Sequence, residues 1–246
     1  MFSIFKKKPR PPHALEGLVC DMHSHFIPGI DDGAPDMETS LSLIRGLIDL
    51  GYKKIITTPH INSDVFPNTP AIINQGRADV VAALEQQGLP VDFHAAAEYL
   101  INDHFARSLT AGEQLLSFRD QLILVEFSFV VPAMNIKEVI FDLQLKGYQP
   151  ILAHPERYLY FAPQKAWYDQ LRDAGCLFQL NLLSFAGHYG PESKELAHYL
   201  VKKGYVDFLG TDLHHQRHLE LLRSSDSIYR AVRQLLDAGV LKNSTL

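Results

Sequence analysis

Histidine and carboxylate side chains follow a series of short apolar runs in the sequence. The first run is followed by Asp21-Met22-His23-Ser24-His25 and then by Asp31-Asp32. Residues of the same kind at or just beyond the ends of later runs are His60, Glu98, Glu126, His154, Asp212 and His214. Neutral imidazole and carboxylate together suit Zn²⁺, Mn²⁺ or Fe²⁺, and the lack of cysteine in the set argues against a structural zinc site. The pattern predicts a divalent-metal centre.

Two spacings within this set support that prediction. His23 and His25 are two positions apart, so on an extended strand end both side chains point to one face and can bind one metal together. Asp212 and His214 repeat the spacing. A single histidine or glutamate at a strand end is more often an ordinary polar residue, but nine such residues on one predicted rim favour a site.

Parts of the pattern also have simpler explanations. Asp31-Asp32-Gly33 fits ordinary turn chemistry, since aspartate and glycine favour turns. Only one of Asp31 and Asp32 needs to be a ligand, and the other could cap a helix that starts near Asp36. Asp21 either orients a ligand imidazole or caps a turn.

Other histidines lie near the rim or away from it. His215 and His218 closely follow the Asp212–His214 pair, and either could contact a substrate. The rest lack partners at ligand spacing and are predicted to be surface or helix residues: His13, His94, His104, His188 and His198.

The elements that would position the rim are strands alternating with helices. Apolar runs without polar alternation suit strands buried on both faces, and their alternation with helical stretches implies parallel βαβ units. The predicted strands cover residues 18–22, 54–57, 91–96, 122–127, 150–153, 177–181 and 206–210. The predicted helices cover residues 37–50, 70–87, 136–146, 164–174 and 192–203.

Seven such units of uniform composition predict one α/β barrel, in which all strand ends open onto one face. An open doubly wound sheet is the alternative, but no glycine-rich phosphate fingerprint follows the first run. We expect residues 17–246 to form this single domain, preceded by a flexible N-terminal arm over residues 1–16. Helix-spaced Leu219, Leu222 and Leu235 are expected in the core.

Composition excludes several classes of protein. The formal charge is −5, from 23 basic and 28 acidic residues, so we expect no nucleic-acid partner. The apolar runs are too short to cross a bilayer, and Met1–Pro12 lacks the apolar core of a signal peptide. Together with only two cysteines, which fits a reducing compartment, this predicts a cytoplasmic protein without stable membrane insertion.

The two cysteines, Cys20 and Cys176, are predicted to be small core residues rather than nucleophiles. A cysteine phosphatase needs an arginine six residues after its cysteine, and those positions hold Phe26 and Leu182.

The motifs HSHFIPGIDDG, TPH, AAEY, EFS, AHPERY and GTDLHH occur in this order along the chain. Together they resemble the PHP (polymerase and histidinol phosphatase) superfamily. Within it, the sequence is most similar to the bacterial tyrosine-protein phosphatases of capsule and exopolysaccharide loci. The resemblance extends from about Asp21 to the last helix, and only the opening HxH is shared with amidohydrolase barrels.

The resemblance implies a distorted seven-stranded parallel β/α barrel of PHP type with three divalent metal ions, Mn²⁺ before Fe²⁺ or Zn²⁺. It also implies that Arg157 binds the substrate phosphate and that Arg217 or His218 provides a second contact. The implied ligand sets are His23, His25, Glu98 and Asp212 for one metal, Glu126 and His154 with a bridging Glu98 for the second, and Asp32, His60 and His214 for the third.

The implied activity is hydrolysis of phosphotyrosine by a metal-bridging hydroxide, with the Tyr-rich tail of a polysaccharide-export tyrosine kinase as the substrate. Metal ions and an arginine fork suit phosphoryl transfer, which depends on positioning and charge neutralisation. A tyrosine leaving group, with a pKa of about 10, departs more readily than an alkoxide and needs less general-acid assistance. The alternatives are a PHP phosphatase for a small metabolite phosphoester, resembling histidinol phosphate, and a non-catalytic metal-binding module. An amidohydrolase is disfavoured because Glu98 and Glu126 stand where such an enzyme carries a carboxylated lysine.

Overall fold

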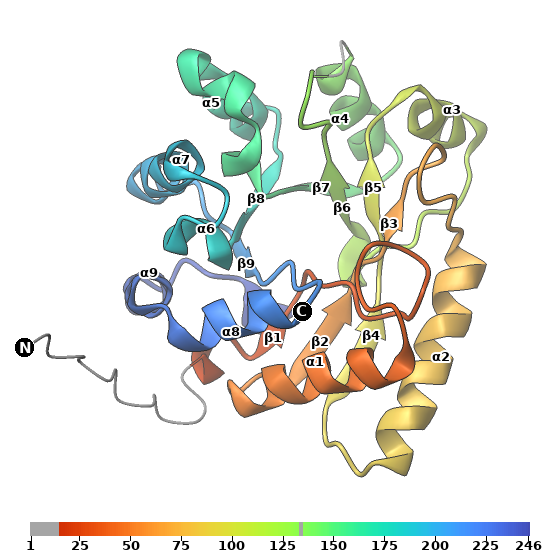
Figure 1. Ribbon diagram of the computed structural model, residues 1–246. Helices are drawn as coiled ribbons and strands as arrows, with labels where there is room; N and C mark the ends of the chain where they lie inside the picture. Colours follow the sequence, from red (N-terminus) through yellow and green to blue (C-terminus); the bar gives the residue numbers. More distant parts are fainter. Residues whose placement is uncertain (1–14, 133–134) are drawn as a thin grey trace, which may run out of the picture.

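The computed structural model describes residues 15–132 and 135–246, with the strands at the centre and the helices around them (Figure 1). The strands are β1 (Cys20–Asp21), β2 (Lys54–Thr57), β3 (His60–Ile61), β4 (Asp92–Ala95), β5 (Glu98–Leu100), β6 (Leu122–Glu126), β7 (Gln149–Ala153), β8 (Leu177–Asn181) and β9 (Phe208–Gly210). The helices are α1 (Met37–Asp49), α2 (Pro70–Gln86), α3 (Asp103–Ala111), α4 (Ile136–Leu145), α5 (Ala166–Asp173), α6 (Leu182–Ala186), α7 (Pro191–Lys203), α8 (Gln216–Ser224) and α9 (Asp226–Asp237).

These strands form two parallel sheets. One has the order β1-β2-β4 and the other the order β3-β5-β6-β7-β8-β9. Each pairing between neighbouring strands in these sheets is parallel, as expected when a helix or a loop returns the chain to the start of the next strand. The predicted α/β fold with parallel strands is therefore confirmed.

The expected single barrel of seven strands is not confirmed, because the residues that the structure describes form nine strands in two sheets. All seven predicted runs contain a strand, and the two additional strands, β3 and β5, continue β2 and β4 after a short break. Pro59 lies between β2 and β3, and because it has no N–H to donate, it interrupts the strand there. The register continues across the break, since Thr57 pairs with Ala95 and His60 with Glu98 at the same offset.

Contacts join β1, the first strand, to β9, the last strand, near both of their ends. Ser24 and Leu213 form a parallel bridge beyond the carboxyl ends of β1 and β9. Near the opposite ends, the amide of Asn243 donates to the carbonyl oxygens of Cys20, at 3.1 Å, and Leu209, at 2.7 Å. Its oxygen accepts from the Leu209 N–H at 3.0 Å. One side chain thereby fastens β1 to β9.

Burial agrees with the predicted core. Cys20 and Cys176 are free thiols and almost completely buried, as expected for small core residues. Burial raises the pKa of the Cys176 thiol to about 12, which leaves it protonated at neutral pH. Leu219, Leu222 and Leu235 are also in the core.

The five predicted helical stretches correspond to α1, α2, α4, α5 and α7 within a few residues at either end. No helix range was predicted for α3, α6, α8 or α9, although the helix-spaced leucines Leu219, Leu222 and Leu235 lie in the last two. Most of the predicted arm lies outside the described residues. Leu15 is described and fully buried, and it donates its N–H to the Leu50 carbonyl at 2.8 Å. This residue, which was predicted as part of the arm, is therefore packed against the fold. Among residues 15–132 and 135–246, no helix combines the length and the apolar character needed to span a bilayer.

Candidate metal centre

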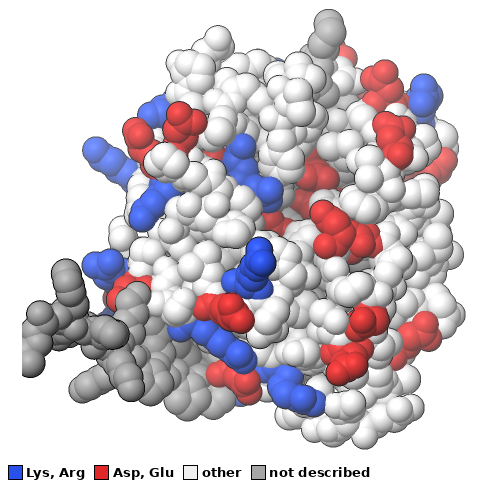
Figure 2. Space-filling view, viewed as in Figure 1, with Lys and Arg blue, Asp and Glu red and all other residues white. Residues whose placement is uncertain are grey.

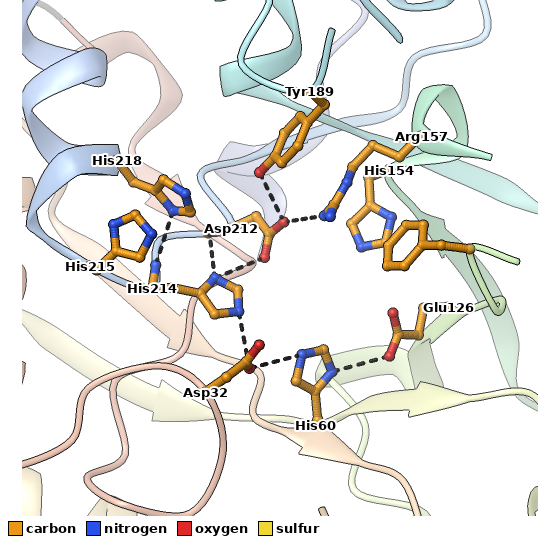
Figure 3. A pocket seen from close by; sticks show the side chains of 11 residues that line it. Asp32, His60, Glu126, His154, Arg157, Tyr189, Asp212, His214, His215 and His218 are labelled. Atoms are coloured by element: carbon orange, nitrogen blue, oxygen red, sulfur yellow. Dashed lines mark hydrogen bonds and ion pairs between the residues drawn. The ribbon is translucent and has the colours of Figure 1, made fainter. Parts of the chain in front are cut away.

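The carboxyl ends of the strands bring the predicted rim together. After β1 and β9 the backbone continues as a ladder, in which His25 N–H donates to Leu213 O at 3.1 Å and Asp212 N–H to His23 O at 2.7 Å. This ladder places the side chains of His23 and His25 beside those of Asp212 and His214. The side chains of Figure 3 come from several strand ends and surround one opening.

Two of the predicted ligands have an unusual backbone. His154 follows β7 with φ of 33°, and Asp212 follows β9 with φ of 49°. Residues other than glycine rarely adopt this left-handed conformation, and it concentrates at functional sites, where surrounding contacts hold it. Here it turns both side chains inward at the point where each strand ends.

All nine predicted ligands fall into four overlapping groups whose ligand atoms lie within 4.8 Å of one another. The groups are His25, Asp32, His60 and His214; His23, His154 and Asp212; His23, His25 and Glu98; and His60, Glu98 and Glu126. The membership of these groups differs from that of the three implied ligand sets, because His25 also lies with Asp32, His60 and His214. They contain only histidine and carboxylate, the donor types predicted for Mn²⁺, Fe²⁺ or Zn²⁺.

Glu98 lies at the centre of the cluster and is fully buried. Its Oε2 atom is 3.2 Å from His23 Nε2 and 3.2 Å from His60 Nδ1, and its Oε1 atom is 3.1 Å from His154 Nε2. Burial raises the pKa of Glu98, but His23 and His60 outweigh this effect and hold the pKa well below its usual value. The carboxylate is therefore ionised and can bridge two cations.

The two carboxylate oxygens of Asp212 contact different groups, one the imidazoles of the cluster and the other Arg157 and Asn181. Oδ1 lies 3.4 Å from the nearest nitrogen of each of His23, His25 and His214. Oδ2 accepts from Arg157 Nη1 at 2.8 Å and from the Asn181 amide at 2.8 Å. One carboxylate thus connects the imidazoles to the arginine.

The donor set fits divalent cations. His25 Nε2 and His60 Nδ1 are buried and have no hydrogen-bond partner among the described residues, although carboxylate oxygens lie 3.1–3.6 Å away. Burial lowers the pKa of His25, but Asp31 and other neighbours raise it to about 10. In the metal-free cluster a proton on the imidazole offsets the buried carboxylate charge. A cation would offset that charge in the proton's place.

Hydrogen bonds to the opposite ring nitrogens orient the ligand imidazoles. His23 Nδ1 donates to Gln179 Oε1 at 2.7 Å, His25 Nδ1 to Asp31 Oδ2 at 2.8 Å, and His214 Nδ1 to the Asp212 carbonyl at 2.9 Å. Each bond leaves Nε2 facing the carboxylates. Such contacts fix the tautomer and the ring plane of a metal ligand.

These contacts also decide between the two neighbouring aspartates. Asp31 orients His25 and accepts the Gly33 N–H, whereas Asp32 Oδ1 lies 3.4–3.5 Å from His60 and His214 and is the candidate ligand. Neither caps the next helix, because Asp36 itself accepts the Thr39 N–H at the start of α1.

Asp21 acts outside the cluster. Both its oxygens accept from Thr211, one from the N–H and one from the hydroxyl, each at 3.0 Å. It thereby ties β1 to the segment after β9, and no hydrogen bond to an imidazole is found for it among the described residues. These contacts tie two distant segments together, which differs from both predicted roles, orienting an imidazole and capping a turn.

Six of the nine cluster residues line a cavity of about 230 Å³, while His23, His25 and Glu98 are fully buried and do not line it. Figure 2 shows acidic side chains within a hollow on this face, with basic and acidic groups interspersed around it. The lining residues are Asp32, His60, Glu126, Phe129, His154, Arg157, Tyr189, Asp212, His214, His215 and His218.

The three predicted phosphate contacts are placed differently. Arg157 lines the cavity through its guanidinium, and His218 lines it as a buried side chain on α8. Burial, with His215 and His214 nearby, lowers the pKa of His218 to about 3, so its ring is neutral. Arg217 is exposed and does not line the cavity. Of the two candidates for the second contact, only His218 faces the site.

Sequence reasoning missed several residues of the site. Gln179, Asn181 and Tyr189 support His23 and Asp212, and Phe129 contacts Arg157. A glutamine and an asparagine inside a buried apolar strand were a usable signal, because buried amides need partners. His188 was predicted to be a surface residue; it is exposed, yet its Nε2 atom lies 3.2 Å from His218 Nε2.

A parallel α/β fold with histidines and carboxylates at its strand ends and an arginine beside them is typical of metal-dependent hydrolases. Comparison with known proteins narrows the class, because residues 19–238 match the family described as capsular polysaccharide synthesis, CpsB/CapC. The chain belongs to this family. The resemblance inferred from the motifs is thereby confirmed, and with it, at the level of the family, the predicted phosphoric monoester hydrolase.

Individual relatives agree with this assignment. The tyrosine-protein phosphatase YwqE of Bacillus subtilis (strain 168) is 33% identical over 195 residues, which cover 79% of this chain and 76% of YwqE. The tyrosine-protein phosphatase CpsB of Streptococcus agalactiae serotype V is 25% identical over 203 residues, covering 79% of this chain and 82% of CpsB.

Solved structures agree as well. A crystal structure from work on YwqE of B. subtilis and CpsB of Streptococcus pneumoniae, described as unique metal-dependent tyrosine phosphatases, superimposes with a TM-score of 0.75. It is 28% identical and covers 91% of this chain and 94% of its own. The histidinol phosphate phosphatase of Lactococcus lactis shares the fold, with a TM-score of 0.54 at 13% identity over 90% of this chain and 92% of its own.

Proposed function

We propose that this protein is a metal-dependent protein-tyrosine phosphatase that hydrolyses phosphotyrosine in a protein substrate. The observation that carries the proposal is the convergence of nine histidine and carboxylate side chains, six of which line a cavity together with Arg157. The family and its members named tyrosine-protein phosphatases support the choice of reaction.

The nine ligands are proposed to hold three divalent ions, with Mn²⁺ as the first candidate and Fe²⁺ or Zn²⁺ as alternatives. His23, His25, Glu98 and Asp212 would hold one ion, and Glu126 and His154 a second, with Glu98 shared. Asp32, His60 and His214 would hold the third, with His25 close enough to contribute. Bound cations would supply an ionised water at neutral pH and neutralise phosphate charge.

The chain's own residues bind and orient the substrate. The Arg157 guanidinium, fixed at one edge by Asp212, can direct its remaining N–H donors to the phosphate oxygens, where a planar fork suits bidentate contact. His218 is proposed as the second contact and, because its ring is neutral, as a hydrogen-bonding group rather than a charge. The tyrosine leaving group, with a pKa of about 10, departs with little proton assistance.

We further propose the finer features that the resemblance implied. The substrate would be the Tyr-rich tail of a polysaccharide-export tyrosine kinase, and the protein would act in the cytoplasm. Residues 17–246 would form one domain, in which the nine strands act as seven segments of a single distorted barrel. The continued register from β2–β4 to β3–β5 and the Ser24–Leu213 bridge support that description.

A phosphotyrosine-peptide assay tests the proposal. Purified protein supplied with Mn²⁺ should release phosphate, and chelation should abolish the release until Mn²⁺ is restored. His23→Ala should remove activity, whereas His94→Ala, a matched change at an exposed histidine on β4, should not. Activity that survives thorough chelation contradicts the metal mechanism. A clear preference in kcat/KM for histidinol phosphate or other small phosphoesters contradicts the phosphotyrosine substrate.

A further inference from the structure

Two aromatic rings pack against the Arg157 guanidinium. Its Cζ atom lies 4.0 Å from the centroid of the Tyr189 ring and 4.4 Å from the centroid of the Phe129 ring. Phe129 stacks in turn on Tyr158, with centroids 5.5 Å apart, and Tyr158 stacks on Tyr160 at 5.9 Å. A planar cation over aromatic faces within about 6 Å is attracted by their quadrupoles. The site therefore carries a continuous stack of four rings and one arginine.

The N–H donors of a guanidinium lie in its own plane, so rings packed against Arg157 leave these donors able to bond at its edges. Nη1 donates to Asp212 Oδ2 at 2.8 Å on one edge. Figure 3 shows Tyr189 and Arg157 reaching Asp212 from the same side of the cavity. Arg157 lines the cavity, so its remaining N–H donors are available to a group bound there.

Two tyrosine hydroxyls anchor the segment that carries Phe129. The Phe127 N–H donates to the Tyr158 hydroxyl at 2.9 Å, and the Tyr160 hydroxyl donates to the Ser128 carbonyl at 3.0 Å. Phe129 nevertheless remains 45% exposed, and the next residue, Val130, is 88% exposed. Phe129 is thus held in place by its backbone and the stack rather than by burial in the core.

From this arrangement we infer that Phe129 and Tyr189 are positioning residues, which clamp Arg157 so that its in-plane donors meet the substrate phosphate. The inference rests on the proposed function, in which Arg157 binds that phosphate. An unclamped arginine has many rotamers and would lose conformational entropy on binding. The clamp removes that cost beforehand.

Binding of orthophosphate, which has no ring that could touch Phe129, tests the inference. The dissociation constant for the Mn²⁺-loaded protein is measured by titration calorimetry. Phe129→Ala should weaken binding about two- to twelvefold, the cost of immobilising one flexible side chain on binding. Phe129→Tyr keeps the ring face and should remain within about twofold of the original protein. Val130→Ala is the matched control on the same loop and should change nothing.

A double-mutant cycle separates clamping from direct contact. In an Arg157→Ala background, which has no guanidinium to clamp, Phe129→Ala should produce no further weakening. Tyr189→Phe keeps the ring over Arg157 and should weaken binding less than Tyr189→Leu. Circular dichroism and melting temperature confirm that each variant is folded, as the exposure of Phe129 leads us to expect.

Several results would overturn the inference. They are an unchanged dissociation constant in Phe129→Ala, an equal loss in Phe129→Ala with and without Arg157, and no orthophosphate binding by the original protein. The proposed function fails separately, if the original protein binds orthophosphate but does not hydrolyse phosphotyrosine peptides. In that case the orthophosphate cycle still decides whether Phe129 acts through Arg157.

Discussion

Replacing Gln179 with leucine should weaken metal binding and leave the fold intact. Gln179 Oε1 accepts from His23 Nδ1 at 2.7 Å, and both side chains are fully buried. Loss of such a contact to a ligand imidazole costs about 10- to 100-fold in metal affinity, or about 1.4–2.7 kcal/mol. Stability should change by only about 1 kcal/mol, because leucine also removes the buried Gln179 Nε2, which has no hydrogen-bond partner among the described residues.

The assay is competition with a chromophoric chelator, which gives the Mn²⁺ dissociation constant. Gln179→Glu restores an acceptor for His23 Nδ1 and should recover the affinity. Gln149→Leu, the same change on β7 at a residue bonded to the Gly175 carbonyl, is the control and should bind metal normally. Unchanged affinity in Gln179→Leu would refute the assignment of His23 as an oriented ligand.

Three further changes have defined outcomes. Asp207→Asn should lower the free energy of unfolding by about 2–3 kcal/mol in chemical denaturation, because this carboxylate accepts from Arg172 and Lys242. Since the pKa of Asp207 is depressed in the folded protein despite burial, the difference should be full at neutral pH and disappear as pH falls through that pKa. Gly33→Ala should reduce bound metal, measured by elemental analysis, because its Cβ would lie 2.2 Å from the His25 carbonyl oxygen. Mn²⁺ affinity should fall steadily as pH is lowered from 8 to 6, since the His25 pKa near 10 requires metal to displace a proton; a flat pH profile would contradict this.

Sequence reasoning located the ligands because their chemistry is local. Imidazoles two residues apart at the end of an apolar run, such as His23 and His25, indicate a site before any fold is known. The strand runs were found for a similar reason, since a buried parallel strand is apolar throughout. The interruptions after β2 and β4 were not found, because whether a residue continues a strand depends on its tertiary pairing.

Residues that act through another residue were harder to predict. Gln179 and Tyr189 lie in segments predicted as a strand and a loop, and their importance appears only when β8 and β9 are adjacent. Phe129 looked like part of an apolar run, and its contact with Arg157 joins two positions 28 residues apart in the sequence. Side-chain partners across a sheet follow from topology and not from spacing.

The ladder between the ends of β1 and β9 has a consequence for how the protein matures in the cell. Asp21 and Thr211, which the ladder brings together, are 190 positions apart. During translation the first histidines therefore emerge long before Asp212 and His214, and a nascent chain that ends before β9 holds seven of the nine ligands and lacks these two. A metal that binds the completed cluster but not the partial one stabilises only the finished chain. Metal would then bind and stabilise the protein only after synthesis is finished, and a chain truncated before β9 would not gain this stabilisation.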